Sequence, residues 1–195
     1  IQDFILFKEA QGLSDRTIED YKWHIKKFIK KTEPIFNNYE SIKRAILKYF
    51  AQGKDLAPAT HNMRRKYLKS FFDWTVDERL IPENPLRYIR QRSEEPRVRD
   101  ITLDMLKSLL NAPDTKTYAG LRDYTLICLS LDTGIRPNEA LSLLPENINI
   151  GSREIVIPSN IAKTRVTRTL PVSKITINAL KRLLSIRPDS WSKSP

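Results

Sequence analysis

The chain has 195 residues, with 34 lysine and arginine residues against 23 aspartate and glutamate residues, which gives a net charge of +11. Its hydrophobic fraction of 40% suffices for a folded core, and its five glycines exclude a collagen-like or linker-like chain. A single cysteine excludes an internal disulfide, and no apolar run approaches the ~20 residues that a membrane span needs, so we expect a cytoplasmic protein without membrane contact.

The first half of the chain is predicted to be helical. Apolar residues recur at spacings of three and four, and glycine or proline follows each of the first three runs. Ser14 is the expected N-cap of the second helix. The four predicted helices cover approximately residues 1–11, 14–33, 39–52 and 58–77.

A polar, charged segment at residues 91–100 contains Pro96 and is the predicted boundary between two domains. We therefore expect a first domain at residues 1–90, a linker at 91–100 and a second domain at 101–195.

The second domain is predicted to be α+β, following an all-α first domain. Residues 119–132 are apolar almost all round, so this helix is expected to be buried on every side. Two strand-like runs flank the polar turn at 159–166 and predict a β-hairpin. The other elements of this domain are predicted helices at 102–110, 137–144 and 175–186 and strands at 154–157 and 167–172.

The positive charge is spread over the whole chain. Residues 1–95 hold 19 basic and 14 acidic residues, and residues 96–195 hold 15 basic and 9 acidic residues. Such a distribution favours a polyanion held by both halves, with nucleic acid as the first candidate. The alternative is that the charge only improves solubility.

Arg136 is the strongest candidate for chemistry. It follows Gly134 and precedes a helix predicted to begin at Pro137, and a guanidinium near helix N-terminal amides suits a phosphate. Glu139, one turn further on, can orient this arginine. The alternative is a solvated arginine near a helix start.

Residues 133–141 (TGIRPNEAL) resemble the segment around the first catalytic arginine of the tyrosine recombinase, or phage integrase, family. Lys163-Thr164 and residues 168–172 (RTLPV) resemble its β-hairpin. The first half resembles its helical core-binding domain at Gly12-Leu13-Ser14, Thr17, Tyr21, Thr60, Asn62, Leu68, Phe71-Phe72, Trp74, Ile81, Asn84 and Pro85. Four motifs in the family's order cover nearly the whole chain.

This resemblance implies a SAM-like helical core-binding bundle, followed by a truncated catalytic domain with a β-hairpin. It implies site-specific DNA recombination in which a tyrosine forms a 3′-phosphotyrosyl bond without a metal or other cofactor. Arg136 matches the first catalytic arginine and Lys163 the hairpin lysine. Arg165 is the alternative to Lys163, but a permanently charged guanidinium is a poor proton donor.

One departure from the family pattern stands out. The family continues with a His/Lys-x-x-Arg motif, another histidine or tryptophan, and the tyrosine. Both histidines here, His24 and His61, and the last tyrosine, Tyr124, precede Arg136. We therefore expect that this chain is part of a longer enzyme and does not cleave DNA by itself.

The expected partner is double-stranded DNA at an attachment or recombination site, with nucleoid association. The resemblance implies a clamp of two domains around the duplex, four protomers on DNA for the full-length enzyme, and a monomer for the fragment. The candidate DNA contacts are Asn62, Arg65, Lys66, Lys69, Arg87, Arg90, Arg92, Arg97 and Arg99.

Three other functions stay open. A non-catalytic DNA-binding regulator would have the same fold without the tyrosine, and a basic helical scaffold would bind no DNA. Type IB topoisomerases share the mechanism, but the compact size and helical first domain favour recombinases. No phosphate loop, zinc motif or carboxylate cluster is present, so nucleotide enzymes and metal-dependent nucleases have no support.

Overall fold

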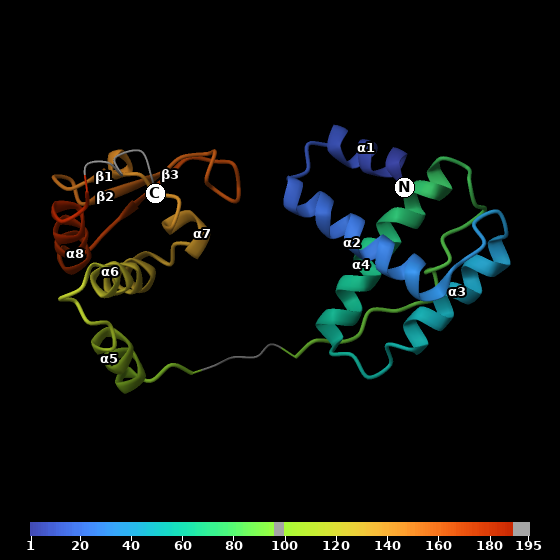
Figure 1. Ribbon diagram of the computed structural model, residues 1–195, viewed down its shortest axis with the longest axis horizontal. Helices are drawn as coiled ribbons and strands as arrows, with labels where there is room; N and C mark the ends of the chain where they lie inside the picture. Colours follow the sequence, from blue (N-terminus) through green and yellow to red (C-terminus); the bar gives the residue numbers. More distant parts are fainter. Residues whose placement is uncertain (96–99, 189–195) are drawn as a thin grey trace. The chain divides into compact units, whose positions relative to one another are not determined.

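The computed structural model describes residues 1–95 and 100–188. The chain divides into two compact units, Ile1–Arg97 and Val98–Pro195, which are described separately. The first is helical, and the second combines helices with a small antiparallel sheet (Figure 1), as the patterning predicts. Within the described ranges, no helix is both long and apolar enough to cross a bilayer.

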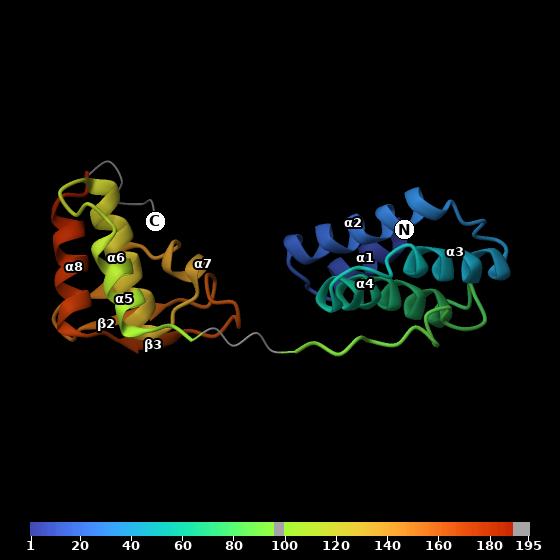
Figure 2. The same ribbon diagram turned by 90° about the horizontal axis from the view of Figure 1, so that it is seen from below.

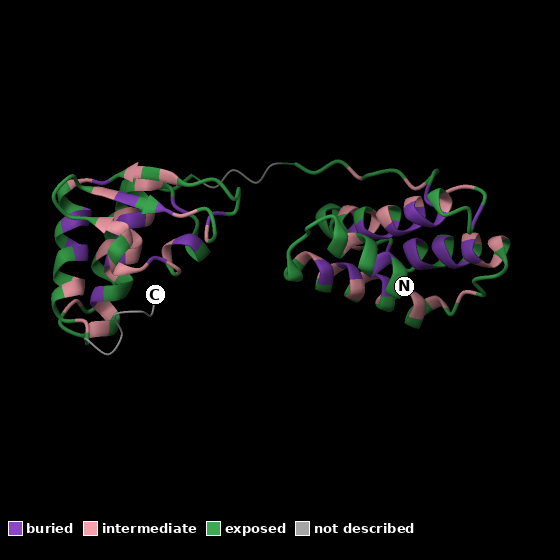
Figure 3. Ribbon diagram, turned by 90° about the horizontal axis from the view of Figure 1, so that it is seen from above, coloured by how far each residue is buried: buried purple, intermediate pink, exposed green. Residues whose placement is uncertain are grey.

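Residues 1–95 form a helical bundle in which α2 packs against α1, α3 and α4. The side chain of Ser14 accepts a hydrogen bond from the Thr17 amide and caps α2, as predicted. Buried residues lie on the inward sides of the helices (Figure 3). The helices are α1 (Gln2–Ala10), α2 (Asp15–Thr32), α3 (Tyr39–Ala51) and α4 (Pro58–Asp77).

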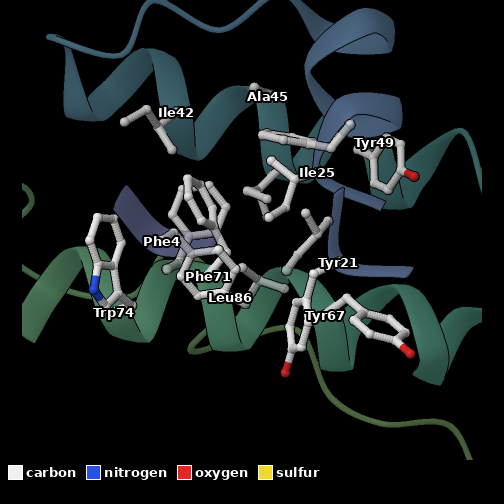
Figure 4. Packing of buried hydrophobic residues seen from close by; sticks show 14 of the residues in the cluster. Phe4, Tyr21, Ile25, Ile42, Ala45, Tyr49, Tyr67, Phe71, Trp74 and Leu86 are labelled. Carbon is white, nitrogen blue, oxygen red and sulfur yellow. The ribbon is translucent and has the colours of Figure 1, made fainter. Parts of the chain in front are cut away.

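An aromatic cluster joins α1, α2 and α4 in the first unit (Figure 4). The Phe4 ring lies 5.4 Å from Tyr21, 5.2 Å from Phe71 and 5.5 Å from Trp74, measured between centroids. Two of these contacts are edge-to-face, the geometry that the aromatic quadrupole favours. Phe4 therefore anchors the short helix α1 to the rest of the bundle.

In the second unit, α6 and α8 pack against each other along one face of the sheet (Figure 2). Leu129 of α6 and Leu180 of α8 share a core with Ile155 and Ile157 of the sheet. The described elements are α5 (Leu103–Asn111), α6 (Tyr118–Thr133), α7 (Pro137–Ala140), the 3-10 helix η1 (Pro145–Asn147), β1 (Ile148–Asn149), β2 (Glu154–Ile157), β3 (Arg168–Pro171) and α8 (Lys174–Ser185).

The sheet has the order β1-β2-β3, with antiparallel pairing throughout. The predicted hairpin is formed by β2 and β3, with Ile157 opposite Arg168 at the end beside the turn. The third strand, β1, was not predicted, because two residues are too few to show an alternating pattern.

Two expectations for the second unit are wrong. Helix α6 is buried on one face only, and Leu131 on its other side is 49% exposed, because α8 and the sheet cover the same side of the helix. The helix predicted at 137–144 ends at Ala140. Leu143 turns into the core and Leu144, which precedes a proline, is extended.

The anchoring role of Phe4 predicts that Phe4→Ala destabilises the first unit by about 3–5 kcal/mol, since it removes a fully buried aromatic ring. Chemical denaturation followed by tryptophan fluorescence measures this change. Phe7→Ala on the same helix is the matched control, because Phe7 is 39% exposed. Equal losses for the two variants would contradict this role.

Candidate active site

The candidate active site is built around the carboxylate of Glu139. Its side chain is 2% exposed, although it is charged. Helix α7 begins with Pro137 at its first position, and Arg136 is the N-cap in an extended conformation. The Arg136 amide donates to Glu139 Oε2 at 3.4 Å, and the Arg136 guanidinium donates through Nη1 to Oε1 at 3.3 Å.

Gly134 directs the chain into this site. It adopts a left-handed conformation with φ 63°, and its amide donates to the Ser130 carbonyl to end α6. Residues with a Cβ rarely adopt this conformation, which explains a glycine between the helix and Arg136. Ile135 then lies in the core, which fixes the backbone directly before the arginine.

The hairpin turn reaches the same carboxylate. The backbone amide of Lys163 donates to Glu139 Oε1 at 3.0 Å, and the Lys163 side chain is exposed. Arg165 follows with a positive φ of 55° and its amide donates to the Ala162 carbonyl. Thus Arg136, Glu139 and Lys163, which the sequence analysis selected, lie together in the structure.

Arg168, the first residue of β3, also binds Glu139. Its Nη1 lies 3.3 Å from Oε1 and its Nη2 lies 2.5 Å from Oε2, a two-pronged ion pair. Arg168 belongs to the segment that resembles the family's hairpin, but the sequence pattern indicates no role for it. The sequence signal that could have found this role is the position of Arg168 in a predicted strand directly after the turn. An inward side chain at that position lies close to the start of α7.

These donors lower the pKa of Glu139 to about 2 from an ordinary value of 4.5. The hydrogen bonds from Arg168 are the main cause, and the amides of Lys163 and Arg136 add to it. In turn, Glu139 raises the pKa of Arg168 above its ordinary value. The carboxylate is therefore ionised at neutral pH.

Several candidate DNA contacts in the first unit have a structural role. The Asn62 amide donates to the Arg92 carbonyl and accepts from the Arg92 amide, both at 2.9 Å. Arg65 donates through Nε to the Ile89 carbonyl, and His61 Nε2 lies 3.2 Å from the Arg90 carbonyl. Helix α4 therefore holds the backbone of residues 89–92.

Three more of these candidates have partners within the unit. Arg92 Nη1 donates to the carbonyls of Lys54 and Leu56, both at 2.9 Å. Lys69 pairs with Asp73 at 2.5 Å, and Arg87 pairs with Glu83 at 3.2 Å. The latter two pairs are exposed and leave their cations accessible to solvent.

The side chains of Lys66 and Arg90 are exposed. Arg97 and Arg99 lie outside the described residues. Among residues 1–95 and 100–188, no group of three histidine, cysteine, aspartate or glutamate side chains can hold a metal ion.

Residues 99–194, which cover nearly all of the second unit, match the model of the phage integrase family. The second unit therefore carries a phage integrase family domain. A "Tyrosine recombinase XerD" from Ralstonia nicotianae is 32% identical over 111 residues, which are 56% of this chain and 35% of the relative. A "Tyrosine recombinase XerD" from Listeria monocytogenes is 27% identical over 195 residues, covering 94% of this chain and 63% of the relative.

Solved integrases share the fold of this chain. A lambda integrase dimer bound to a COC′ core site matches with a TM-score of 0.69 and 18% identity, over 95% of this chain and 53% of that one. The Tn1549 transposon integrase in complex with circular intermediate DNA matches with a TM-score of 0.66 and 19% identity, over 94% and 63%. The chain therefore spans between one third and two thirds of the length of these proteins.

The lowered pKa of Glu139 predicts how the free energy of unfolding depends on pH. Because its pKa is lowered by folding, its contribution to the free energy of unfolding is complete above about pH 4.5 and is lost as the pH falls toward 2. Glu139→Gln should lower the free energy of unfolding at pH 7 by about 1–3 kcal/mol, since it leaves charged donors unpaired.

Denaturant titrations followed by circular dichroism at pH 2–7 check this prediction. As the pH falls from about 4.5 toward 2, the free energy of unfolding should decrease less for Glu139→Gln than for the unsubstituted chain. The control is Glu146→Gln, because Glu146 is an exposed glutamate of the same unit. Parallel pH profiles for Glu139→Gln and the unsubstituted chain would show that Glu139 is not the titrating group.

Proposed function

We propose that this chain is the DNA-binding and partial catalytic region of a site-specific recombinase that breaks and rejoins duplex DNA through a tyrosine nucleophile. The observation that carries the proposal is the convergence of Arg136 and the Lys163 turn on the buried carboxylate of Glu139. The family match of the second unit and the relatives named tyrosine recombinases support it.

The proposed role of Arg136 is to bind the scissile phosphodiester. Its side chain is 49% exposed, and one of its five N–H groups donates to Glu139 through Nη1. The remaining donors suit the non-bridging oxygens, where negative charge develops during attack by the nucleophile. Glu139 fixes the guanidinium and so reduces the entropy that phosphate binding costs.

The proposed role of Lys163 is to protonate the leaving 5′-oxygen. An ammonium group on a flexible stem can deliver a proton, whereas the guanidinium of Arg165 remains charged. The amide bond to Glu139 anchors the base of the lysine, and its side chain is exposed at the turn. One carboxylate thus connects the group that binds the phosphate with the group that supplies the proton.

We propose that both units bind the same duplex, as a clamp. The excess of basic residues in each half of the sequence supports this arrangement. Three of the candidates then position the segment 89–92: Asn62, Arg65 and Arg92. The others supply positive charge to the phosphates in this proposal: Lys66, Lys69, Arg87, Arg90, Arg97 and Arg99. For a complete enzyme, this function implies four protomers on two DNA sites.

The clamp predicts strongly salt-dependent DNA binding. If roughly six to eight cations neutralise phosphates, the slope of log affinity against log salt is about −5 to −7. Fluorescence anisotropy with a labelled duplex between 50 and 200 mM salt measures it. Lys66→Ala should reduce the slope by about one, while Lys43→Ala, which removes a cation paired with Glu40 on α3, should leave it unchanged. A flat salt response would contradict the clamp.

The polypeptide of residues 1–195 should bind DNA without forming a covalent bond to it. Its last tyrosine, Tyr124, precedes Arg136 and lies on α6, so within this proposal the nucleophile is not among residues 125–195. Incubation with a nicked suicide duplex, followed by denaturing electrophoresis, tests this. A covalent adduct formed by this polypeptide would refute the assignment.

A further inference from the structure

Arg168 and Arg136 compete for one carboxylate. Arg168 donates from two nitrogens to both oxygens of Glu139, whereas the Arg136 guanidinium donates from Nη1 to one oxygen at 3.3 Å. Bidentate pairing of this kind is the stronger arrangement for a guanidinium and a carboxylate. Glu139 therefore holds Arg168 more tightly than it holds the side chain of Arg136.

The carboxylate is saturated with donors. Five N–H groups of the described residues converge on it: two from the Arg168 guanidinium, the guanidinium and amide of Arg136, and the amide of Lys163. A carboxylate offers about four lone-pair sites. Little acceptor capacity is left for a second bond from the Arg136 guanidinium. The other N–H donors of Arg136 are therefore not taken up by Glu139.

The backbone of Arg168 is fixed independently of this ion pair. In the sheet, Arg168 lies opposite Ile157, which is completely buried, and the turn that carries Lys163 closes directly before β3. The side chain of Arg168 is 30% exposed, less than the 49% of Arg136. Arg168 thus approaches the carboxylate from the sheet, while Arg136 approaches it from the helix start.

We propose that Arg168 is a positioning residue, which occupies both oxygens of Glu139 and thereby keeps the Arg136 guanidinium available for the scissile phosphodiester. Without Arg168, Arg136 is the remaining guanidinium beside a buried carboxylate. Arg136 and Glu139 are three residues apart at the start of α7, so their side chains then form a two-pronged pair with each other. This inference rests on the proposed function, because it assigns the phosphodiester as the ligand of Arg136.

Charge supports the same conclusion. Arg136 and Arg168 around one Glu139 leave a net charge of +1 before Lys163 is counted. Loss of Arg168 makes this group neutral, because the Glu139 carboxylate then balances Arg136 alone. A neutral ion pair attracts an anionic phosphodiester much less than a guanidinium with free donors does.

A double-mutant cycle between positions 136 and 168 tests the proposal. The 195-residue chain is compared with Arg168→Gln, Arg136→Gln and the double variant for binding of a labelled duplex at 50 mM salt. If Arg168 acts through Arg136, Arg168→Gln weakens binding about five- to tenfold in the unsubstituted chain and less than twofold in the Arg136→Gln background. Equal effects in both backgrounds would overturn the proposal, because they indicate a direct contact or general electrostatics.

Arg122→Gln is the control for the loss of one positive charge, since Arg122 pairs with its neighbour Asp123 in the same unit. Its effect should be less than twofold. Arg168→Lys retains the positive charge but not the planar guanidinium that donates to both oxygens of Glu139. About threefold weaker binding of the duplex is therefore expected. If Arg168→Gln is unfolded by circular dichroism, Arg168→Lys takes its place in the cycle.

Hydrogen exchange of the Lys163 amide gives a measurement that needs no DNA. Reorganisation of Glu139 toward Arg136 should weaken the bond from this amide, so its exchange should accelerate at least tenfold in Arg168→Gln. Unchanged exchange would overturn the proposal even if DNA binding could not be measured. Failure of the unsubstituted chain to bind any duplex would instead refute the proposed function.

Discussion

The buried carboxylate of Glu139 is the constraint on which the arrangement of the second unit depends. A buried charge without partners is costly, and here the partners come from three places in the sequence. They are the residue before α7, the hairpin turn and the start of β3. Satisfying one carboxylate thus forces the helix start and the sheet edge together, and this places Arg136 and Lys163 in one site.

Helix α4 has a comparable role in the first unit. Three of its side chains, His61, Asn62 and Arg65, bind backbone groups of residues 89–92, where the chain leaves the bundle. Asn62 and Arg65, which the sequence predicts as DNA contacts, therefore have a structural role in this unit. Their substitution affects the path of the chain, so the exposed Lys66 is the cleaner probe of the proposed phosphate contacts.

Most elements were predictable because they depend on local patterns. Apolar spacing together with caps such as Ser14 and Gly134 predicted the long helices. The predicted helix start after Gly134 selected Arg136 and Glu139, and the resemblance to the family's hairpin selected Lys163. Features set by tertiary packing were not predictable from one segment. Leu131 is exposed, the helix after Arg136 stops at Ala140, and the pairing of Arg168 with Glu139 joins residues 29 positions apart.

One ionised carboxylate, that of Glu139, holds both candidate catalytic segments. A pH titration of the chain by NMR, which observes the side-chain carboxyl of Glu139 and the backbone amide of Lys163, tests it most directly. We expect a pKa of about 2 for Glu139 and a change in the Lys163 amide with the same midpoint. A Glu139 carboxyl that titrates near its ordinary value of 4.5, with no response from the Lys163 amide, would contradict it.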